Sequence, residues 1–185
     1  MLAQQIFGGH GYIAEHGMEQ FVRDARIAMI YEGANGIQAL DLVGRKLPKD
    51  GGRALQAFFA EVSGYIKEAD AAMAPYTKPL AAALGELREA TLWFAQNAPG
   101  NPDNAGAGAT DYMQVFGLVT FGYMWAKMAK VAQDKIAGSG VTSYLSTKLV
   151  TGRFFMERML PETTVHLARI QTGSATTMEL AAEAF

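Results

Sequence analysis

The sequence contains no cysteine among its 185 residues. Disulfide bonds, thiolate nucleophiles and cysteine-ligated metal ions are therefore excluded. Histidine is scarce as well, with only His10, His16 and His166, and the first two lie across glycines rather than at ligand spacing on a helix. A metal site is consequently not expected.

Charge is sparse, since only 18% of the residues are charged while 50% are hydrophobic, and the formal net charge is -2. No strongly basic run is available to bind a phosphate backbone, so nucleic acid is not an expected partner. A composition this apolar indicates that part of the surface meets a partner or another domain.

Long apolar runs are also missing, and a secretory leader is not expected. The opening residues MLAQQIFGGHGY lack the basic and continuous apolar segments of a secretory signal. No apolar stretch reaches the roughly 18 residues that a membrane-spanning helix needs. Together with the lack of cysteine, these features predict a soluble protein of the cytoplasm.

Alternation typical of β-strands is rare, whereas helical periodicity recurs from one end of the chain to the other. Helices are expected over 18–29; 35–46, capped by Asn35; 54–74, ending before Pro75; 77–97, with Pro79 in the first turn; 111–134, apolar on most sides and buried; 141–169, interrupted at Pro161; and 175–182, capped by Ser174. The predicted fold is all-α, an antiparallel up-and-down helical bundle with a helical C-terminal extension.

Two segments are poor in helical signals. The stretch KLPKDGGR has the composition of a linker, and APGNPDNAGAGAT, residues 98–110, is the most loop-like part of the chain. The predicted organisation is a first helical domain at residues 1–46, a linker at 47–53 and a second helical domain at 54–185.

Glycines cluster in FGGHGY and in YEGANG. Gly8 and Gly9 permit either a tight turn at a helix end or the approach of a flat ligand to the backbone. Glu32, followed by Gly33, is either a carboxylate held in an apolar cavity as a strengthened base or one that lies near the start of the next helix. The residues alone favour the simpler interpretation in both cases and leave both open.

Other chemistries find little support. Ser139, Ser143 and Ser146 have no evident His/Asp partners, so a hydrolase triad is not expected. The paired glycines do not follow a strand, which excludes a dinucleotide-binding loop of the Rossmann type.

Two further groups have a plain interpretation and a functional one. For the aromatic and methionine side chains from Tyr112 to Met128, packing in the core is the favoured interpretation and an acyl tunnel is the alternative. Arg153, Arg158 and Arg169 favour solvated faces or ion pairs across a subunit interface over contacts with CoA phosphates.

Four motifs, QIFGGHGY at 5–12, VRDARI at 22–27, IYEG at 30–33 and IQ at 37–38, resemble the C-terminal helical domain of the acyl-CoA dehydrogenases in order and spacing. The rest of the chain is similar, on fewer residues, to the helical extension of a larger subgroup of that family that includes enzymes for methylthiopropanoyl-type thioesters. Its marks are DY at 111–112, KL at 148–149, RFF at 153–155 and RMLP at 158–161.

The resemblance implies roles for residues in and beside the two glycine clusters. Glu32 would be the catalytic base that removes the α-proton of an acyl-CoA while the β-hydride leaves for FAD, and its backbone N–H would stabilise the enolate oxygen. Gly33 would lie against the acyl chain. The implied cofactor-binding residues are Gln5, Ile6, Phe7, Gly8, Gly9, Ala34, Asn35 and Gly36.

The sequence departs from the family pattern after the Glu-Gly pair. Thr-Ser-Gln is usual there, whereas this chain has Ala34, Asn35 and Gly36, and the usual basic residue after Ile-Gln is Ala39. Flavin contacts at this turn would therefore come from the backbone and from Asn35.

The family's N-terminal helical domain and middle β-domain have no counterpart in these residues. We therefore expect a C-terminal part of an FAD-dependent acyl-CoA dehydrogenase, an oxidoreductase of fatty acid β-oxidation that forms a homodimer and passes electrons to an electron-transfer flavoprotein. Alone, the chain is expected to retain no FAD and to be inactive. The alternative is a non-catalytic helical interaction or dimerisation module.

Overall fold

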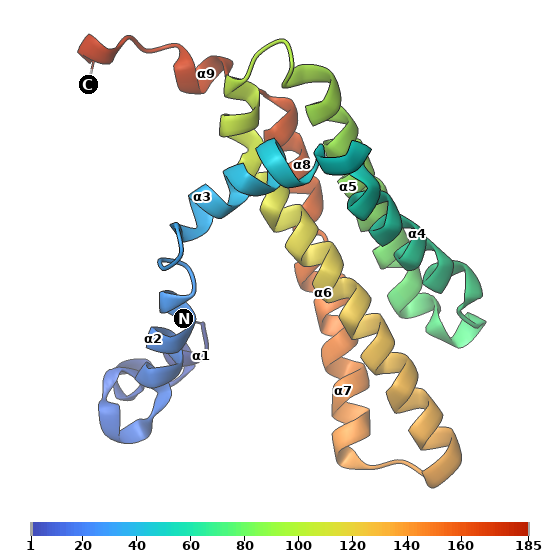
Figure 1. Cartoon of the computed structure of the whole chain (residues 1–185). Helices are drawn as coiled ribbons and strands as arrows, with labels where there is room; N and C mark the ends of the chain where they lie inside the picture. The colour runs from blue at the N-terminus through green and yellow to red at the C-terminus, as the bar shows by residue number, and fades with distance from the viewer. Residues whose placement is uncertain (1, 185) are drawn as a thin grey trace. The chain divides into compact units, whose positions relative to one another are not determined.

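The computed structural model describes residues 2–184, and all regular structure in this range is helical, with no strand (Figure 1). The prediction of an all-α helical bundle is confirmed. The chain divides after Gln38 into two compact units, here called the N-terminal unit (residues 2–38) and the C-terminal unit (residues 39–184).

The N-terminal unit has almost no core. It comprises α1 (Leu2–Ile6), two 3-10 turns (Gly8–Tyr12 and Ala14–His16), α2 (Met18–Ile27) and the first half of α3 (Ala34–Asp41). Gly11 is the only buried residue of this unit, and a Cβ there would lie 2.3 Å from the backbone oxygen of Gln4, so the turn after α1 requires glycine. The predicted helix over 18–29 begins where expected and ends slightly earlier.

The C-terminal unit continues from α3 into longer helices. Its elements are a π-helical turn (Leu42–Lys46), a 3-10 turn (Lys49–Gly52), α4 (Arg53–Glu68), a 3-10 turn (Ala71–Met73), α5 (Ala74–Asn97), α6 (Asp103–Ser139), α7 (Ser143–Phe154), a π-helical turn (Phe155–Met159), α8 (Glu162–Gln171), α9 (Ala175–Met178) and a 3-10 turn (Ala182–Ala184). In Figure 1, α4 and α5 form one hairpin and α6 and α7 another, and α6 packs against α5, α7 and α8.

The core lies where α5 and α6 meet. Leu80, Leu84 and Leu87 are buried at helical spacing on α5, and each contributes roughly 2 kcal/mol by leaving water. Tyr112 of α6 is fully buried, with its ring centroid 5.4 Å from that of Phe94 in an edge-on arrangement. This packing explains why the apolar stripe of α5 belongs to the core.

Only half of the prediction of a buried aromatic helix over 111–134 holds. Tyr112 and Tyr123 are buried as expected, but Phe121 is 62% exposed and Met124 is also exposed. The helix α6 is apolar on more faces than its neighbours α5, α7 and α8 cover.

The expected boundary at Pro75 and Pro79 is wrong. The helix α4 already ends at Glu68, and α5 begins at Ala74, so that Pro75 lies in its first turn and Pro79 inside it. Proline is well tolerated in a first turn because the N–H that it lacks has no partner there. Pro75, which was expected to follow the end of a helix, therefore lies at the beginning of one.

The expected loop over 98–110 is also shorter than predicted, because α6 begins at Asp103 and includes Gly106 and Gly108. A Cβ on Gly108 would lie 2.8 Å from Cζ of Phe94. Glycine is therefore needed here for close packing of two helices, and that requirement outweighs its low helix propensity.

Two predicted helix caps are not formed. Asn35 lies inside the first turn of α3 rather than before it, and Ser174 makes no capping hydrogen bond with the short α9. The Ser174 hydroxyl donates instead to Oδ1 of Asn104, at 3.0 Å. The expected interruption at Pro161 is confirmed, since α8 begins directly after it.

Candidate functional site

The predicted base Glu32 lies in the turn that joins α2 to α3. Three successive residues of this turn, Glu32, Gly33 and Ala34, have positive φ angles of 55°, 96° and 58°. The two that are not glycine adopt this left-handed conformation at a cost on the order of 1 kcal/mol each or more. The Asn35 N–H donates to the carbonyl of Met29, at 3.1 Å, and closes the turn.

Gly33 and Gln38 hold the backbone around Glu32. A Cβ on Gly33 would lie 3.2 Å from Cγ2 of Ile37, and its φ angle already favours glycine. The side-chain amide of Gln38 donates to the carbonyl of Glu32. The N–H of Glu32 has no acceptor within residues 2–184, so it remains available to donate.

The Glu32 side chain is exposed, and so is that of its neighbour Tyr31. The N-terminal unit therefore does not form the apolar cavity around Glu32 that one interpretation of the sequence required. The simpler interpretation, a carboxylate near the start of the next helix, agrees with the position of Glu32 two residues before the start of α3.

The predicted cofactor residues form two groups within the N-terminal unit. Gln5 to Gly9 are all exposed around the end of α1, where the Gln4 side chain donates to the Gly11 carbonyl at 3.3 Å. Ala34 and Asn35 are half-buried in the first turn of α3. No hydrogen bond or ion pair joins the two groups in the described part of the chain.

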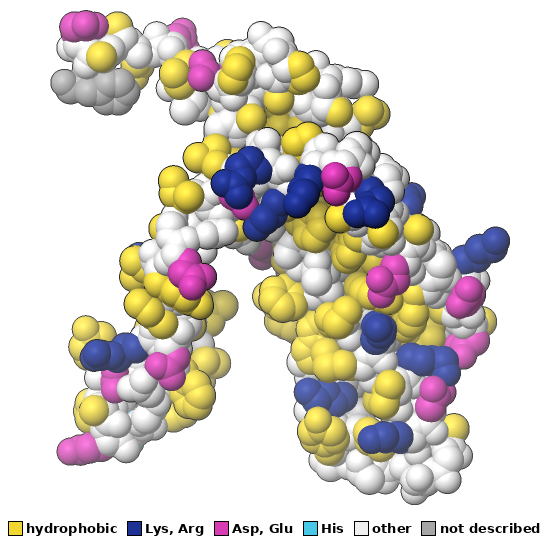
Figure 2. Space-filling model, in the orientation of Figure 1, with side chains coloured by type: hydrophobic (Ala, Val, Ile, Leu, Met, Phe, Trp, Pro, Cys, Tyr) yellow, Lys and Arg dark blue, Asp and Glu magenta, His cyan; other side chains and the backbone are white. Residues whose placement is uncertain are grey.

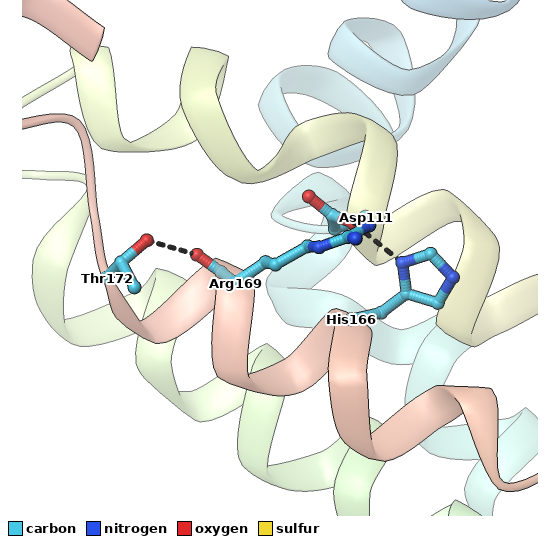
Figure 3. Close-up of polar contacts among 4 residues, drawn as sticks. All are labelled: Asp111, His166, Arg169 and Thr172. Carbon is cyan, nitrogen blue, oxygen red and sulfur yellow. Dashed lines mark hydrogen bonds and ion pairs between the residues drawn. The ribbon is translucent and has the colours of Figure 1, made fainter. Parts of the chain in front are cut away.

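A polar cluster that the sequence did not reveal ties α6 to α8 (Figure 3). Nδ1 of His166 lies 2.6 Å from Oδ1 of Asp111, and Nη1 of Arg169 lies 3.7 Å from the same oxygen. The Thr172 hydroxyl donates to the Arg169 carbonyl, at 2.6 Å. The only sign of this cluster in the sequence is that Arg169 follows His166 by three positions, which places both on one face of a helix.

This cluster is best explained as an interhelical contact. It contains no serine or cysteine nucleophile, and within residues 2–184 no three His, Cys, Asp or Glu residues come close enough to hold a metal ion. Arg169 lies within ion-pair distance of the Asp111 carboxylate of its own chain. Of the arginines for which ion pairs across a subunit interface were expected, Arg169 therefore has a partner within the chain.

A pocket of about 470 Å³ opens in the C-terminal unit between the segment 43–56 and the end of α5. Its walls are mostly apolar, including Leu55 and Phe94, with Thr91 among the few polar side chains. The Thr91 hydroxyl lies 2.8 Å from the Tyr112 hydroxyl, and burial raises the pKa of Tyr112 to about 12. The sequence did not predict this pocket, because its walls come from segments far apart in the chain.

None of the described helices combines the length and the apolar composition needed to cross a membrane.

The C-terminal unit matches a known protein family. The family model described as acetyl-CoA dehydrogenase C-terminal like covers residues 58–181. The chain belongs to the acyl-CoA dehydrogenase family. A second model, the acyl-CoA dehydrogenase C-terminal domain, matches residues 1–47. The resemblance inferred from the motifs is thereby confirmed.

Two acyl-CoA dehydrogenases match nearly the whole chain. The 3-methylmercaptopropionyl-CoA dehydrogenase of Ruegeria pomeroyi is 34% identical over 94% of the chain and 30% of its own length. The broad-specificity linear acyl-CoA dehydrogenase FadE5 of Mycobacterium tuberculosis is 30% identical over 98% of the chain and 31% of its own length. The chain thus spans less than a third of the length of these relatives.

Shorter matches show a higher identity. The probable acyl-CoA dehydrogenase fadE25 of Mycobacterium leprae is 56% identical over 36 residues, which are 20% of the chain. The acyl-CoA dehydrogenase family is therefore recognised in two ways, by a strongly similar short segment and by a weaker similarity along the full chain.

Proposed function

We propose that this chain is the C-terminal part of an FAD-dependent acyl-CoA dehydrogenase, with Glu32 as the catalytic base. The observation that carries the proposal is the turn of Glu32, Gly33 and Ala34, whose three left-handed residues present the carboxylate and leave the Glu32 N–H free to donate. Such a turn carries a conformational cost, which is typical of functional sites.

The proposed reaction removes two hydrogens from adjacent carbons of an acyl-CoA thioester. The Glu32 carboxylate takes the α-proton, and the electrons of that C–H bond form the α,β double bond as a hydride leaves the β-carbon. The Glu32 N–H donates to the thioester oxygen, which gains negative charge as the proton is removed. Gly33 gives the acyl chain room beside the base.

Residues 5–9 and 34–36 are suited to a flat ring. At Gly8, Gly9 and Gly36, no atom lies within 4 Å of where a Cβ would be, so a planar group can approach the backbone. Gln5 and Asn35 supply the polar side chains of the two groups. Bound FAD would supply the hydride acceptor.

The wider setting is proposed from the family as well. It comprises a homodimer that shares FAD, electron transfer to an electron-transfer flavoprotein, a role in fatty acid β-oxidation and a cytoplasmic location. We likewise propose the division into an end of the catalytic helical domain at 1–46, a linker at 47–53 and an extension at 54–185.

By itself, the 185-residue chain is proposed to be inactive. The base and residues 5–9 are exposed, so water competes for every contact that the reaction needs. After incubation with FAD and gel filtration, the chain should carry no flavin absorbance, and it should reduce no dye when an acyl-CoA is added. Retained flavin or dye reduction would refute this part of the proposal.

Replacing Glu32 with Gln in the full-length protein that contains this chain tests the base. Loss of a positioned general base should lower kcat by about 10²- to 10⁴-fold, while flavin absorbance stays unchanged. The matched control is Glu15→Gln, since Glu15 is exposed in a neighbouring turn and has no proposed role. Equal activity of the Glu32 and Glu15 variants would rule out the assignment.

A non-catalytic interaction module is the second candidate, favoured by the exposed apolar side chains of the N-terminal unit, including Leu2 at 86% and Ile6 at 85%. Titration of the full-length protein with FAD and with an acyl-CoA separates the two candidates. A pure interaction module would bind neither ligand.

A further inference from the structure

A shallow groove runs between α6 and α7 near the turn that joins them. Its volume is about 320 Å³, and three of its lining residues are lysines, namely Lys127, Lys135 and Lys148. The floor is apolar, with Val131 and Leu145 among its side chains. Figure 2 shows cationic side chains set among hydrophobic ones over this end of the α6–α7 hairpin.

Helix geometry sets the spacing of these charges. Lys127, Val131 and Lys135 follow each other at intervals of four on α6, and therefore share one face, with the two lysine Cα atoms about 12 Å apart. Tyr144 and Lys148 form the opposite wall with the same interval on α7. The groove therefore has cations toward its two ends and apolar and aromatic groups between them.

Aromatic rings hold two of the ammonium groups in place. The Lys127 ammonium lies 5.0 Å from the ring centre of Tyr123, and the Lys148 ammonium lies 5.5 Å from the ring centres of both Trp125 and Tyr144. A ring attracts a cation but leaves N–H groups free to donate.

The three lysines of the groove have no anionic partner in the described part of the chain. No carboxylate lies within ion-pair distance of them, and no acidic residue lines the groove. The nearby Asp134 is engaged by Lys130, at 2.5 Å, on another face of α6. Gathering unpaired like charges around an apolar floor creates a positive potential that an anion would neutralise.

We propose that this groove binds an organic phosphate that carries a planar ring. Three cations match a group with several negative oxygens better than a single carboxylate. The Tyr144 side chain is 68% exposed and offers a surface on which a planar ring can stack. The phosphate oxygens meet Lys127 and Lys148, the ring lies against Tyr144 and Val131, and Lys135 adds positive charge at the other end of the groove.

The proposal uses only the C-terminal unit and does not depend on Glu32 or on the dehydrogenase reaction. Calorimetric titration of the 185-residue chain at low salt, with ADP and with inorganic pyrophosphate as probes, tests it. Both probes should bind saturably at one site per chain. Binding should weaken as salt is added, because the contact is ionic.

Variants assign the binding to the groove. Lys127→Gln and Lys148→Gln keep most of each aliphatic stem and should weaken both probes about tenfold each. Tyr144→Ala should weaken ADP but leave pyrophosphate unchanged, because only ADP has a ring to stack. Lys130→Gln is the matched control, since Lys130 already pairs with Asp134 and does not line the groove. Circular dichroism of each variant shows whether it is folded.

Several results would overturn the proposal. One is the absence of saturable binding of ADP and pyrophosphate by the folded wild-type chain. Another is a Lys130→Gln variant that loses as much affinity as Lys148→Gln. That result would mean that the probes are attracted by the overall charge of the chain and not by the groove. Sedimentation of the chain with vesicles of anionic phospholipid, without binding of ADP, would assign the groove to a lipid surface instead.

Discussion

Gly108 illustrates how one residue can set the distance between two helices. It is buried on α6 against the ring of Phe94, where a Cβ would lie 2.8 Å from Cζ. Gly106, one half-turn earlier, is exposed and has open space where its Cβ would be. Packing therefore requires glycine at position 108 of α6 but not at position 106.

The Gly108→Ala variant should be destabilised by about 1–3 kcal/mol, because the added methyl group displaces Phe94 or separates α5 from α6. Gly106→Ala, the matched control, should instead be stabilised by about 0.5–1 kcal/mol through the higher helix propensity of alanine. Urea unfolding followed by circular dichroism gives both values. Equal shifts for the two variants would contradict the assigned packing.

At the scale of elements, α5 and α6 share a buried polar contact within an apolar interface. The Thr91 hydroxyl meets the Tyr112 hydroxyl at 2.8 Å and also donates to the Leu87 carbonyl, at 2.8 Å. The Tyr112 side chain is fully buried, so its ionised form is strongly disfavoured and its pKa rises to about 12. Ionisation of this phenol therefore destabilises the helix pair.

This contact predicts a loss of stability at alkaline pH. Tyrosine ionises near pH 10 in the unfolded chain but only near pH 12 at Tyr112 in the folded one, so the folded state binds the extra proton between these values. The contribution is complete below about pH 10 and is lost as the pH rises toward 12, by about 2–3 kcal/mol.

Urea unfolding between pH 9 and about pH 12 measures this dependence. Tyr112→Phe should reduce the slope and cost about 1 kcal/mol at neutral pH through the lost hydrogen bond. Part of the slope should remain, because the pKa of buried Tyr123 is also raised to about 12. An unaltered slope in Tyr112→Phe would contradict the prediction.

At the scale of the whole molecule, the two units differ in how much they bury. Only Gly11 is buried within residues 2–38, whereas the C-terminal unit contains the whole described apolar core, from Ala39 to Ile170. Because stability comes chiefly from removing apolar surface from water, the two units must differ in stability.

We therefore expect a chain that begins at Ala34, which keeps α3 whole, to unfold cooperatively at the same temperature as the complete chain. Hydrogen exchange of the complete chain should show rapid exchange in α1 and α2 and slow exchange in α5 and α6. Thermal unfolding followed by circular dichroism compares the two chains. A clearly lower midpoint for the shorter chain, or strong protection in α2, would show that residues 2–33 add to the stable core.

The sequence alone determined the helical class and the family. Helical periodicity is a local property, and the motifs around Gly8 and Glu32 lie within short segments, so neither requires knowledge of distant contacts. Tertiary structure decided where α5 and α6 begin, the pairing of Asp111 with His166, and the grouping of lysines between α6 and α7. Each of these depends on residues that are far apart in the chain, and only packing brings them into contact.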